Sequence, residues 1–227
     1  MNLDLTVVDR RGETPVSVEI DHLVIAGWTG RDPAAVQAHI AELEEIGVPR
    51  PANIPAYYRC AAALLTTAGR IEVAGGDSSG EAEFVLLSAG GDMLVGVGSD
   101  HTDRRLETTG VTLSKQVCAK PIGASVWKFD DLAGHWDALV LRSFAVAEDG
   151  ARQLYQEGAV TAMRAPADLL AGYGAPQLPP RAAMFCGTLA VQGKIRPSAA
   201  FEIELSDPVL GRHLRHRYEI TELPVEG

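Results

Sequence analysis

Most apolar residues of this chain fall into short runs, several of which alternate with polar residues at a period of two, as is typical of strands. Turn residues such as Gly-Gly, Asp-Gly and Ser-Asp-Pro bound many of these runs. The pattern predicts strands over residues 23–28, 84–89, 93–98, 138–146, 159–163, 184–191, 201–205 and 215–220. The last two alternate clearly, and we expect them to form an antiparallel hairpin through the SDPVLG turn region.

Three segments have the features of helices. The best of them covers residues 33–46, because Asp32 is a suitable N-cap, Pro33 favours the first helical position and Gly47 can end the helix. Its predicted buried stripe consists of Val36, Ile40 and Leu43. A second, short helix begins near Pro166, and a third covers residues 130–139. The sequence therefore predicts a mainly β fold of the α+β class with a few peripheral helices.

Composition and charge narrow the function. The chain has 227 residues and a net charge of -10, which fits one domain with a sizeable core and argues against nucleic acid as a partner. Its three cysteines are far apart and form no C-x-x-C pair, so a disulfide framework or a structural zinc site is not expected. The N-terminus lacks the apolar core of a signal peptide, and no run reaches the length of a membrane span. We expect a cytoplasmic protein with no membrane partner.

A pair of acidic residues precedes one predicted strand. Glu81 and Glu83 flank a single alanine, so both side chains point to the same face of an extended chain. The run that follows, residues 84–87, is apolar on both faces, which predicts a strand buried on both sides and carboxylates that are hard to solvate. Glu202 and Glu204 have the same spacing but alternate with apolar residues, which predicts a solvated face. We expect water or a cation to offset the repulsion between Glu81 and Glu83.

A third acidic residue follows the next predicted strand. If the segment LSAGGDM is a tight hairpin, this strand returns to the start of the previous one and Asp100 lies beside Glu81 and Glu83. Three carboxylates favour Mg²⁺, Mn²⁺ or Ca²⁺ over Zn²⁺. His101 and Asp103 are alternative ligands in the same loop. Helix capping is the alternative role for Asp100 or Asp103.

Other polar motifs are weaker candidates. His39 and Glu42 lie three residues apart on the predicted helix, where a carboxylate can orient an imidazole and raise its basicity; a surface pair is the alternative. The segment GDSSGE resembles the nucleophile segment of trypsin-like serine proteases, but no matching histidine segment precedes it. We expect Ser78 to occupy a glycine-rich turn. His213 and His216 lie on the final hairpin and are expected to be surface groups.

Seven segments of the chain resemble, in order, motifs of the fumarylacetoacetate hydrolase (FAH) family over residues 23–222. The segment HIAELEEIGVPRPANIPAYYR resembles its H-x-x-E motif with the following proline-rich turn and strand. GEAEFVLL resembles its E-x-E strand, and SDHTDRRLE its D-x-T-x-R-D-x-Q loop. SKQVCAKPIG, LYQEGAVTAM and FCGTL resemble its K-S-F-x-x-x-x-P-x-G, Q-x-x-x-T and G-T-P motifs. The seventh is the closing hairpin.

The resemblance implies a fold, a metal and a set of roles. The implied fold is a mixed β-sandwich roll, usually a homodimer, with a smaller part over residues 1–70 that carries a lid helix and a catalytic core over residues 71–227. The implied metal is Mg²⁺, with Mn²⁺ or Ca²⁺ as alternatives, held by Glu81, Glu83 and Asp100. The resemblance also implies that His39 and Glu42 form a base dyad and that Lys115 is a catalytic cation. The substrate-binding groups that it implies are Arg104, Thr188 and Lys120.

The loop on the substrate side departs from the family. Arg105 and Glu107 stand where the family has an aspartate and a glutamine. The span from Asp100 to Lys115 is shorter than usual, so Lys120 is the alternative counterpart of the family lysine.

The activity that the resemblance implies is hydrolysis of a C–C bond in a β-diketo or 2-oxo acid of the acylpyruvate kind. The partner implied is a small carboxylic-acid substrate. The alternatives are a decarboxylase, isomerase or tautomerase of a related 2-oxo acid, and a catalytically silent protein that binds a small acid.

Overall fold

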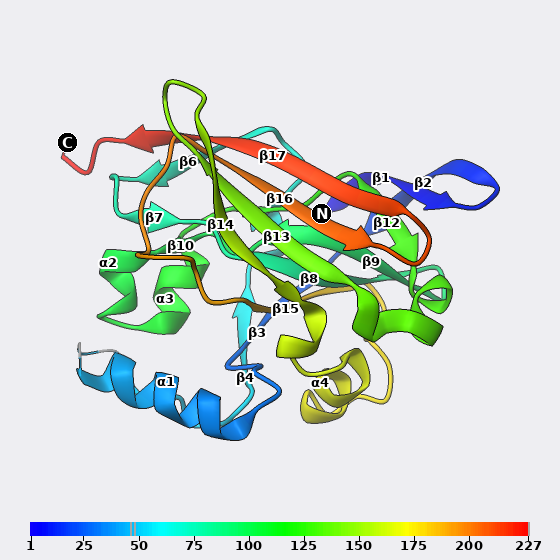
Figure 1. The fold of residues 1–227 in the computed structure, drawn as a ribbon, viewed down its shortest axis with the longest axis horizontal. Helices are drawn as coiled ribbons and strands as arrows, with labels where there is room; N and C mark the ends of the chain where they lie inside the picture. The colour runs from blue at the N-terminus through cyan, green and yellow to red at the C-terminus, as the bar shows by residue number, and fades with distance from the viewer. Residues whose placement is uncertain (46, 48, 227) are drawn as a thin grey trace.

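Strands dominate the computed structural model, which describes residues 1–45, 47 and 49–226 without the side chain of Leu43. The strands of these residues form two large sheets (Figure 1) and two short strand pairs. The eight-stranded sheet contains, in spatial order, β2 (Gly12–Glu19), β1 (Asn2–Asp9), β12 (Ser125–Lys128), β9 (Asp92–Ser99), β8 (Ala82–Ala89), β15 (Ala182–Thr188), β3 (His22–Gly27) and β4 (Ala56–Cys60). The five-stranded sheet contains β14 (Arg152–Ala159), β13 (Val140–Val146), β16 (Ala200–Asp207), β17 (Arg212–Leu223) and β6 (Arg70–Ala74). The short pairs are β10 (Thr102–Asp103) with β7 (Ser78–Ser79), and β11 (Lys120–Pro121) with β5 (Leu65–Thr66).

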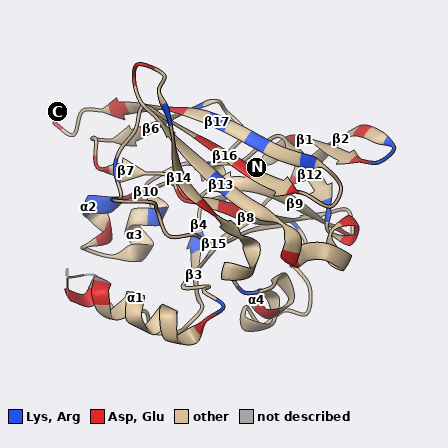
Figure 2. Ribbon diagram, viewed as in Figure 1, with Lys and Arg blue, Asp and Glu red and all other residues tan. Residues whose placement is uncertain are grey.

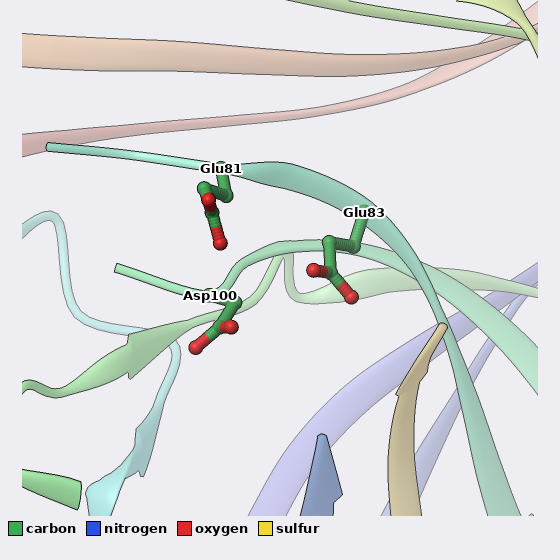
Figure 3. Close-up of side chains that lie close together, drawn as sticks. All are labelled: Glu81, Glu83 and Asp100. Carbon is green, nitrogen blue, oxygen red and sulfur yellow. The ribbon is translucent and has the colours of Figure 1, made fainter. Parts of the chain in front are cut away.

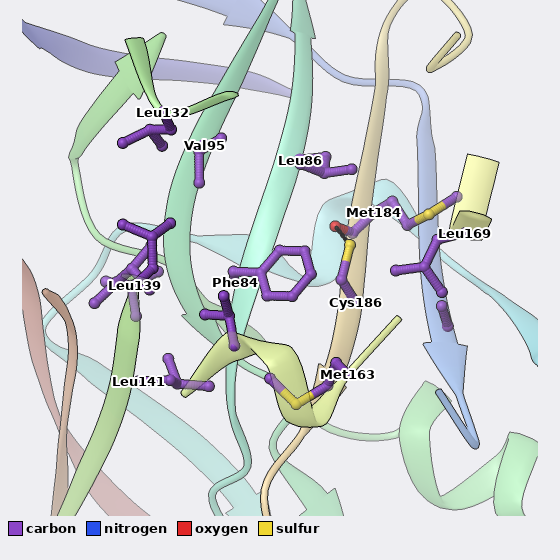
Figure 4. Packing of buried hydrophobic residues seen from close by; sticks show 14 of the residues in the cluster. Phe84, Leu86, Val95, Leu132, Leu139, Leu141, Met163, Leu169, Met184 and Cys186 are labelled. Carbon is purple, nitrogen blue, oxygen red and sulfur yellow. Dashed lines mark hydrogen bonds between the residues drawn. The ribbon is translucent and has the colours of Figure 1, made fainter. Parts of the chain in front are cut away.

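The main core lies between the two large sheets. Phe84 and Leu86 of β8 pack there together with Leu141 of β13 and with Ile203 and Leu205 of β16. Figure 4 shows Phe84, Leu86 and Leu141 among the side chains of this core. Burial of this apolar surface is what holds the two sheets face to face.

A second core covers the opposite face of the eight-stranded sheet. Val85 and Leu87, the neighbours of the first-core residues along β8, pack there with Leu3 and Leu5 of β1. The sheet therefore curls so that its N-terminal hairpin lies against its own centre. Strand β8 is buried on both faces, as its continuous apolar run predicts. Parallel pairs (β1 with β12, β15 with β3) and antiparallel pairs mix in this sheet, which confirms the predicted mainly β, mixed roll.

The helices lie at the periphery. They are α1 (Pro33–Glu45), α2 (Arg104–Glu107), α3 (Val111–Gln116) and α4 (Pro166–Gly172), with 3₁₀ turns over Ala62–Leu64, Phe129–Asp131, Ala133–Ala138 and Val160–Ala162. Asp32 caps α1 as predicted, because its Oδ1 accepts a hydrogen bond from Ala34 N over 2.9 Å. Val36 and Ile40 are buried; the predicted third member of the stripe, Leu43, lies outside the described side chains. Every helix in the described part of the chain is too short or too polar to cross a membrane.

Three expectations about local structure need correction. Residues 159–163 are not a strand, because β14 ends at Ala159 and a 3₁₀ turn follows. The helix expected over 130–139 consists of short 3₁₀ turns with a kink at His135. The N-terminal hairpin of β1 and β2 was not expected, although Leu3, Leu5 and Val7 alternate and are buried. Its partner β2 is a polar edge strand, the position where a proline such as Pro15 is tolerated.

The expectation that Glu202 and Glu204 share a solvated face is wrong for Glu204. Its side chain is only 8% exposed and lies between Arg142, at 3.3 Å, and Arg215, its partners on the two neighbouring strands. Figure 2 shows the basic residues along β17 that face the acidic residues of β16. Long arginine side chains thus cover a face that alternation alone marks as open to water.

The two histidines of the final strand differ in their surroundings. His213 is exposed as expected, whereas His216 is partly buried and its Nε2 is buried without a hydrogen-bond partner among the described residues. Burial lowers the pKa of His216, so this ring is held neutral and is not the surface group that was predicted.

Candidate functional site

The β8–β9 hairpin brings three acidic residues to one end of the sheet. Gly90 and Gly91 form its turn with φ values of +59° and +96°, the left-handed conformation that a two-residue hairpin turn requires. The ladder runs in register to the other end of the hairpin, where Asp100 N donates to Glu81 O over 2.9 Å. The predicted hairpin is therefore confirmed, and it sets Asp100 beside the strand end that carries Glu81 and Glu83.

The side chains of these three residues, named the acidic cluster below, face a common space (Figure 3). One carboxylate oxygen from each lies within 4.8 Å of the others. Glu83 and Asp100 are 2% and 0% exposed, and the Glu81 side chain is 15% exposed. Three carboxylates so close and so poorly solvated repel one another strongly unless cations or protons offset their charge.

Three cationic side chains surround the acidic cluster. Lys115 Nζ lies 3.3 Å from Glu81 Oε2 and also contacts Asp100 Oδ2. Lys120 Nζ lies 2.9 Å from Asp100 Oδ1, and Arg104 Nη2 lies 2.9 Å from Glu81 Oε1. The structure thus places both candidate lysines against Asp100. Lys120 is completely buried, whereas the Lys115 side chain is 8% exposed and lies nearer to solvent.

Burial and charge act in opposite directions on these groups. Burial raises the pKa of Asp100, but Lys115 and Lys120 outweigh it and bring that pKa to about 2. Burial likewise raises the pKa of Glu81, and Arg104 and Lys115 hold it below its usual value. Burial lowers the pKa of Lys115, but the carboxylates around it, Asp100 above all, raise that pKa beyond the usual value. Lys115 is therefore a fixed cation in this arrangement and not a base.

Glu83 is the member of the cluster that lacks a cation of its own within ion-pair distance, among the residues described. Its Oε2 accepts a hydrogen bond from Gly187 N over 2.7 Å. Gly187 lies at a bulge of β15 with φ of +99°, and a Cβ there would lie 1.7 Å from Thr29 Oγ1, so only glycine fits. Burial and then the charge of Asp100 raise the pKa of Glu83 well above its usual value. The charged form of this carboxylate is therefore the most costly of the three in the absence of a further cation.

The donor set fits a hard divalent cation. Carboxylate oxygens are the ligands that Mg²⁺ and Ca²⁺ prefer. Asp100 Oδ1 is buried and has no hydrogen bond from any described residue, although Lys120 Nζ lies within ion-pair distance. Asp100 Oδ1 and the Glu83 carboxylate therefore have oxygen lone pairs that receive few hydrogen bonds from the described residues. Glu81, Glu83 and Asp100 are the residues that would hold such an ion.

A chain of buried hydrogen bonds lies behind the acidic cluster. Ser78 Oγ lies 2.9 Å from His101 Nε2, and His101 Nδ1 lies 3.1 Å from Tyr218 OH. Tyr218 donates to Ser99 Oγ over 2.8 Å, and Ser99 Oγ also accepts from Glu81 N. A neutral ring with its proton on Nδ1 satisfies every one of these bonds. Sequence reasoning missed Tyr218 and Ser99, because the pattern of an alternating strand gives no signal for such a role.

The alternative ligands of the loop have other partners. Asp103 Oδ1 accepts from Leu106 N over 2.9 Å and caps α2, which is the capping role weighed for this residue. His101 turns both ring nitrogens toward Ser78 and Tyr218. Ser78 lies in strand β7 and not in the turn that was expected.

Gln156 is a buried residue that links two parts of the site. Its Oε1 accepts from Ala82 N over 3.0 Å and from Ser143 Oγ over 2.7 Å. Its Nε2 donates to Thr188 Oγ1 over 2.8 Å, and Thr188 in turn donates to Ala82 O. Since Ala82 separates the two glutamates, Gln156 fixes the backbone that aims them. The only signal for Gln156 in the sequence is its place in the segment LYQEGAVTAM. The Thr188 hydroxyl, which the resemblance assigns to the substrate, donates its hydrogen bond to the backbone of β8 in this structure.

His39 and Glu42 lie on the open side of α1, and the structure does not bring them to the acidic cluster. His39 Nδ1 is 3.6 Å from Glu42 Oε2, and the two side chains are 61% and 76% exposed. The His39 ring also packs near Trp28, with 6.0 Å between ring centroids. In Figure 1, α1 lies apart from β8 and β9, on the side of α2 and α3. The base role of His39 stays a prediction.

Comparisons with known proteins agree with this architecture. Residues 26–218 match the family described as "Protein of unknown function (DUF2848)". No curated protein gives a significant match.

Solved structures of similar fold cover nearly the whole chain. A hexagonal crystal form of 2-keto-3-deoxyarabinonate dehydratase matches with a TM-score of 0.67 and 15% identity, over 96% of this chain and 79% of that one. The structure of 2-keto-3-deoxy-D-arabinonate dehydratase complexed with magnesium and 2,5-dioxopentanoate gives a TM-score of 0.62 and 15% identity, over 96% of this chain and 79% of that one. Cg1458 with an inhibitor gives 0.63 and 14%, over 94% and 81%. At such identities the likeness establishes the fold alone, and it confirms the FAH-like roll.

The first prediction from this geometry concerns metal binding. Replacing Glu83 by alanine removes one of three oxygen donors, so Mg²⁺ or Mn²⁺ binding measured by calorimetry should be lost or much weakened. Glu202→Ala is the matched control, since Glu202 has the same spacing in FEIEL but pairs with Arg152 on the outer face; it should bind metal normally. Unchanged affinity in Glu83→Ala would remove Glu83 from the site.

The second prediction concerns acid stability. Burial, followed by the charges of Lys120 and Arg104, lowers the pKa of His101 to about 3, whereas the unfolded chain takes up this proton near pH 6.5. Between these values the unfolded state binds more protons, so this group makes the free energy of unfolding fall as the pH falls, by at most about 1.4 kcal/mol per pH unit.

In metal-free protein, denaturant unfolding at pH 6.5 and pH 4.5 should therefore show a smaller acid loss for His101→Gln than for wild type. The difference should be about 2 kcal/mol. The exposed His213→Gln is the control and should follow wild type. Equal acid losses in the two variants would mean that His101 is not held neutral.

Proposed function

Because the chain belongs to the DUF2848 family and has an FAH-like fold, we propose that it is a metal-dependent enzyme that acts on a 2-oxo acid. The observation that carries the proposal is the acidic cluster, three poorly solvated carboxylates of which Glu83 has no cation within ion-pair distance among the described residues. A protein of similar fold was determined with magnesium and 2,5-dioxopentanoate, which supports the same chemistry here.

In this proposal Glu81, Glu83 and Asp100 hold Mg²⁺, with Mn²⁺ and Ca²⁺ as alternatives. When bound, such an ion supplies a Lewis acid that polarises a 2-oxo carbonyl and stabilises negative charge beside it. Glu83 would bind such an ion as the carboxylate. Arg104 keeps Glu81 ionised and oriented through its ion pair, and the buried hydrogen-bond chain holds the Glu81 backbone from behind.

Lys115 and Thr188 would bind and activate the substrate. Lys115 is a permanent ammonium group beside two of the carboxylates, where it can donate a hydrogen bond to an oxygen that gains negative charge. Thr188 can offer its hydroxyl to the substrate carboxylate once it exchanges the hydrogen bond it now donates to Ala82 O. Lys120 acts from the buried side by holding Asp100.

The reaction we favour is hydrolysis of a C–C bond in an acylpyruvate-like acid. His39, oriented by Glu42, takes a proton from water, and the hydroxyl oxygen adds to the distal keto carbon. The bond between that carbon and the methylene group then breaks, and its electron pair stays on the 2-oxo fragment. His39 returns its proton to this fragment, so the products are a carboxylic acid and a 2-oxo acid. Helix α1 has to close on the site for this step, as lids commonly do.

A lyase is the second candidate, favoured by the 61% exposure of the His39 side chain. Decarboxylation or dehydration needs no activated water, so a site built from the acidic cluster and Lys115 is sufficient for it. An isomerase or tautomerase would use His39 to move a proton without cleavage. A screen of acylpyruvates and oxaloacetate with Mg²⁺ or Mn²⁺, with analysis of the products, separates these reactions. Absence of turnover together with absence of metal binding would leave a silent acid-binding protein.

The third prediction tests the hydrolytic base. His39→Ala should lower kcat about a hundredfold to ten-thousandfold while metal affinity and thermal stability stay at wild-type values, because the side chain is exposed. His213→Ala, another exposed histidine, should keep full activity. Near wild-type turnover in His39→Ala would reduce the dyad to a surface pair and favour the lyase.

The fourth prediction separates the two lysines. Lys115→Met also removes a partner of Asp100, but Lys120 still holds that carboxylate, so the variant should remain folded. It should lose about a hundredfold in kcat, since it removes a charge that faces the substrate. Lys120→Met should mainly lower the free energy of unfolding, by about 3 kcal/mol, because a buried charge of Asp100 loses a partner. If Lys120→Met instead folds as wild type and is inactive, Lys120 is the substrate lysine.

A further inference from the structure

A large cleft opens at the start of α3, the helix that carries Lys115. Its volume is about 1020 Å³, and it lies between the segment 49–58, the start of α3, Arg164 and Gly172. Ligand sites commonly enclose roughly 300–1,000 Å³, whereas a 2-oxo carboxylate group alone fills only a small part of such a volume. The cleft therefore has room for a substrate that extends well beyond its 2-oxo acid end.

Two independent paths of contact connect the cleft to the acidic cluster. On one side, Val111 and Thr112 of α3 line the cleft, and Lys115 follows them by four and three residues on the same face of the helix, about 5 Å further along its axis. On the other side, Arg164 N donates to Thr29 O over 2.8 Å. Thr29 in turn packs against Gly187. The amide of Gly187 donates a hydrogen bond to Glu83 of the acidic cluster.

The cleft differs in charge from the rest of the protein. The chain carries 30 acidic against 20 basic residues, yet the described lining contains two arginines and no Asp or Glu. Arg50 is neutralised by Glu44, at 2.9 Å. The Arg164 guanidinium, by contrast, has no carboxylate within ion-pair distance among the described residues, and its residue is partly buried.

We propose that Arg164 binds a second anionic group on the substrate, so that the enzyme selects 2-oxo acids with a terminal carboxylate. This inference rests on the proposed function, because the 2-oxo end has to be held at the acidic cluster for the far end to reach the cleft. A guanidinium binds a carboxylate through two parallel hydrogen bonds, which gives both affinity and direction. Tyr57 and Tyr58 supply walls for the chain between the two ends.

The test compares pairs of acids of equal length that differ only at the far end. The pairs are 2-oxopentanoate with 2-oxoglutarate, and 2-oxoheptanoate with 2-oxoheptanedioate. Each is titrated by calorimetry in the presence of saturating Mg²⁺ into wild type, Arg164→Gln, Arg164→Lys and the control Arg50→Gln. In at least one pair the dicarboxylate should bind wild type about tenfold to a hundredfold more tightly.

That preference should vanish in Arg164→Gln, return in part in Arg164→Lys and persist in Arg50→Gln, whereas the monocarboxylates should bind all four proteins alike. Equal binding of both members in every pair, or a preference that survives in Arg164→Gln, would overturn the role of Arg164 and leave the proposed function standing. Absence of Mg²⁺-dependent binding for every 2-oxo acid would overturn the proposed function and this inference with it.

Discussion

Mutual repulsion among three poorly solvated carboxylates is the constraint around which this end of the molecule is organised. Glu81, Glu83 and Asp100 meet within 4.8 Å at a place where water has little access, and each needs a compensating partner. The chain supplies Arg104 and Lys115 to Glu81, Lys115 and Lys120 to Asp100, and only a backbone amide to Glu83. This uneven compensation lowers the pKa of Asp100 and raises that of Glu83. A divalent cation would compensate the charge of Glu83, for which the described residues supply no partner of opposite charge.

The surrounding fold holds these groups in place from several directions. The hairpin fixes Asp100 opposite Glu81, the bulge in β15 aims an amide at Glu83, and Gln156 clamps the backbone between the two glutamates. These supports come from both large sheets and from the buried hydrogen-bond chain. The site is therefore positioned by rigid elements, as precise chemistry demands, whereas the candidate base sits on a peripheral helix.

Much of this arrangement could be predicted from local sequence signals. The Gly-Gly turn and the double-sided apolar run after Glu83 were sufficient to predict the hairpin and the meeting of the acids. Side-chain coverage was not predictable in the same way, since Glu204 alternates like Glu202. It is buried by Arg215 of the neighbouring hairpin strand and by Arg142, which lies on a strand distant in sequence. The same limit applies to Gln156 and Tyr218, whose roles arise from tertiary contacts, and to the position of His39 relative to the acids. The division into residues 1–70 and 71–227 and the homodimer remain predictions.

The connection between β3 and β4 has a consequence for how such proteins diversify. These two strands are antiparallel neighbours at the edge of the eight-stranded sheet, so residues 28–55, with α1 among them, form one excursion that leaves and re-enters the sheet at adjacent points. Lengthening or rebuilding a loop of this kind changes the folding free energy only slowly, and it leaves β8, β9 and the acids untouched. In the proposed function, the residues that hold the metal and the residue that moves the proton therefore lie on separate parts of the chain. The proton-transfer group could then be exchanged without any change to β8 and β9.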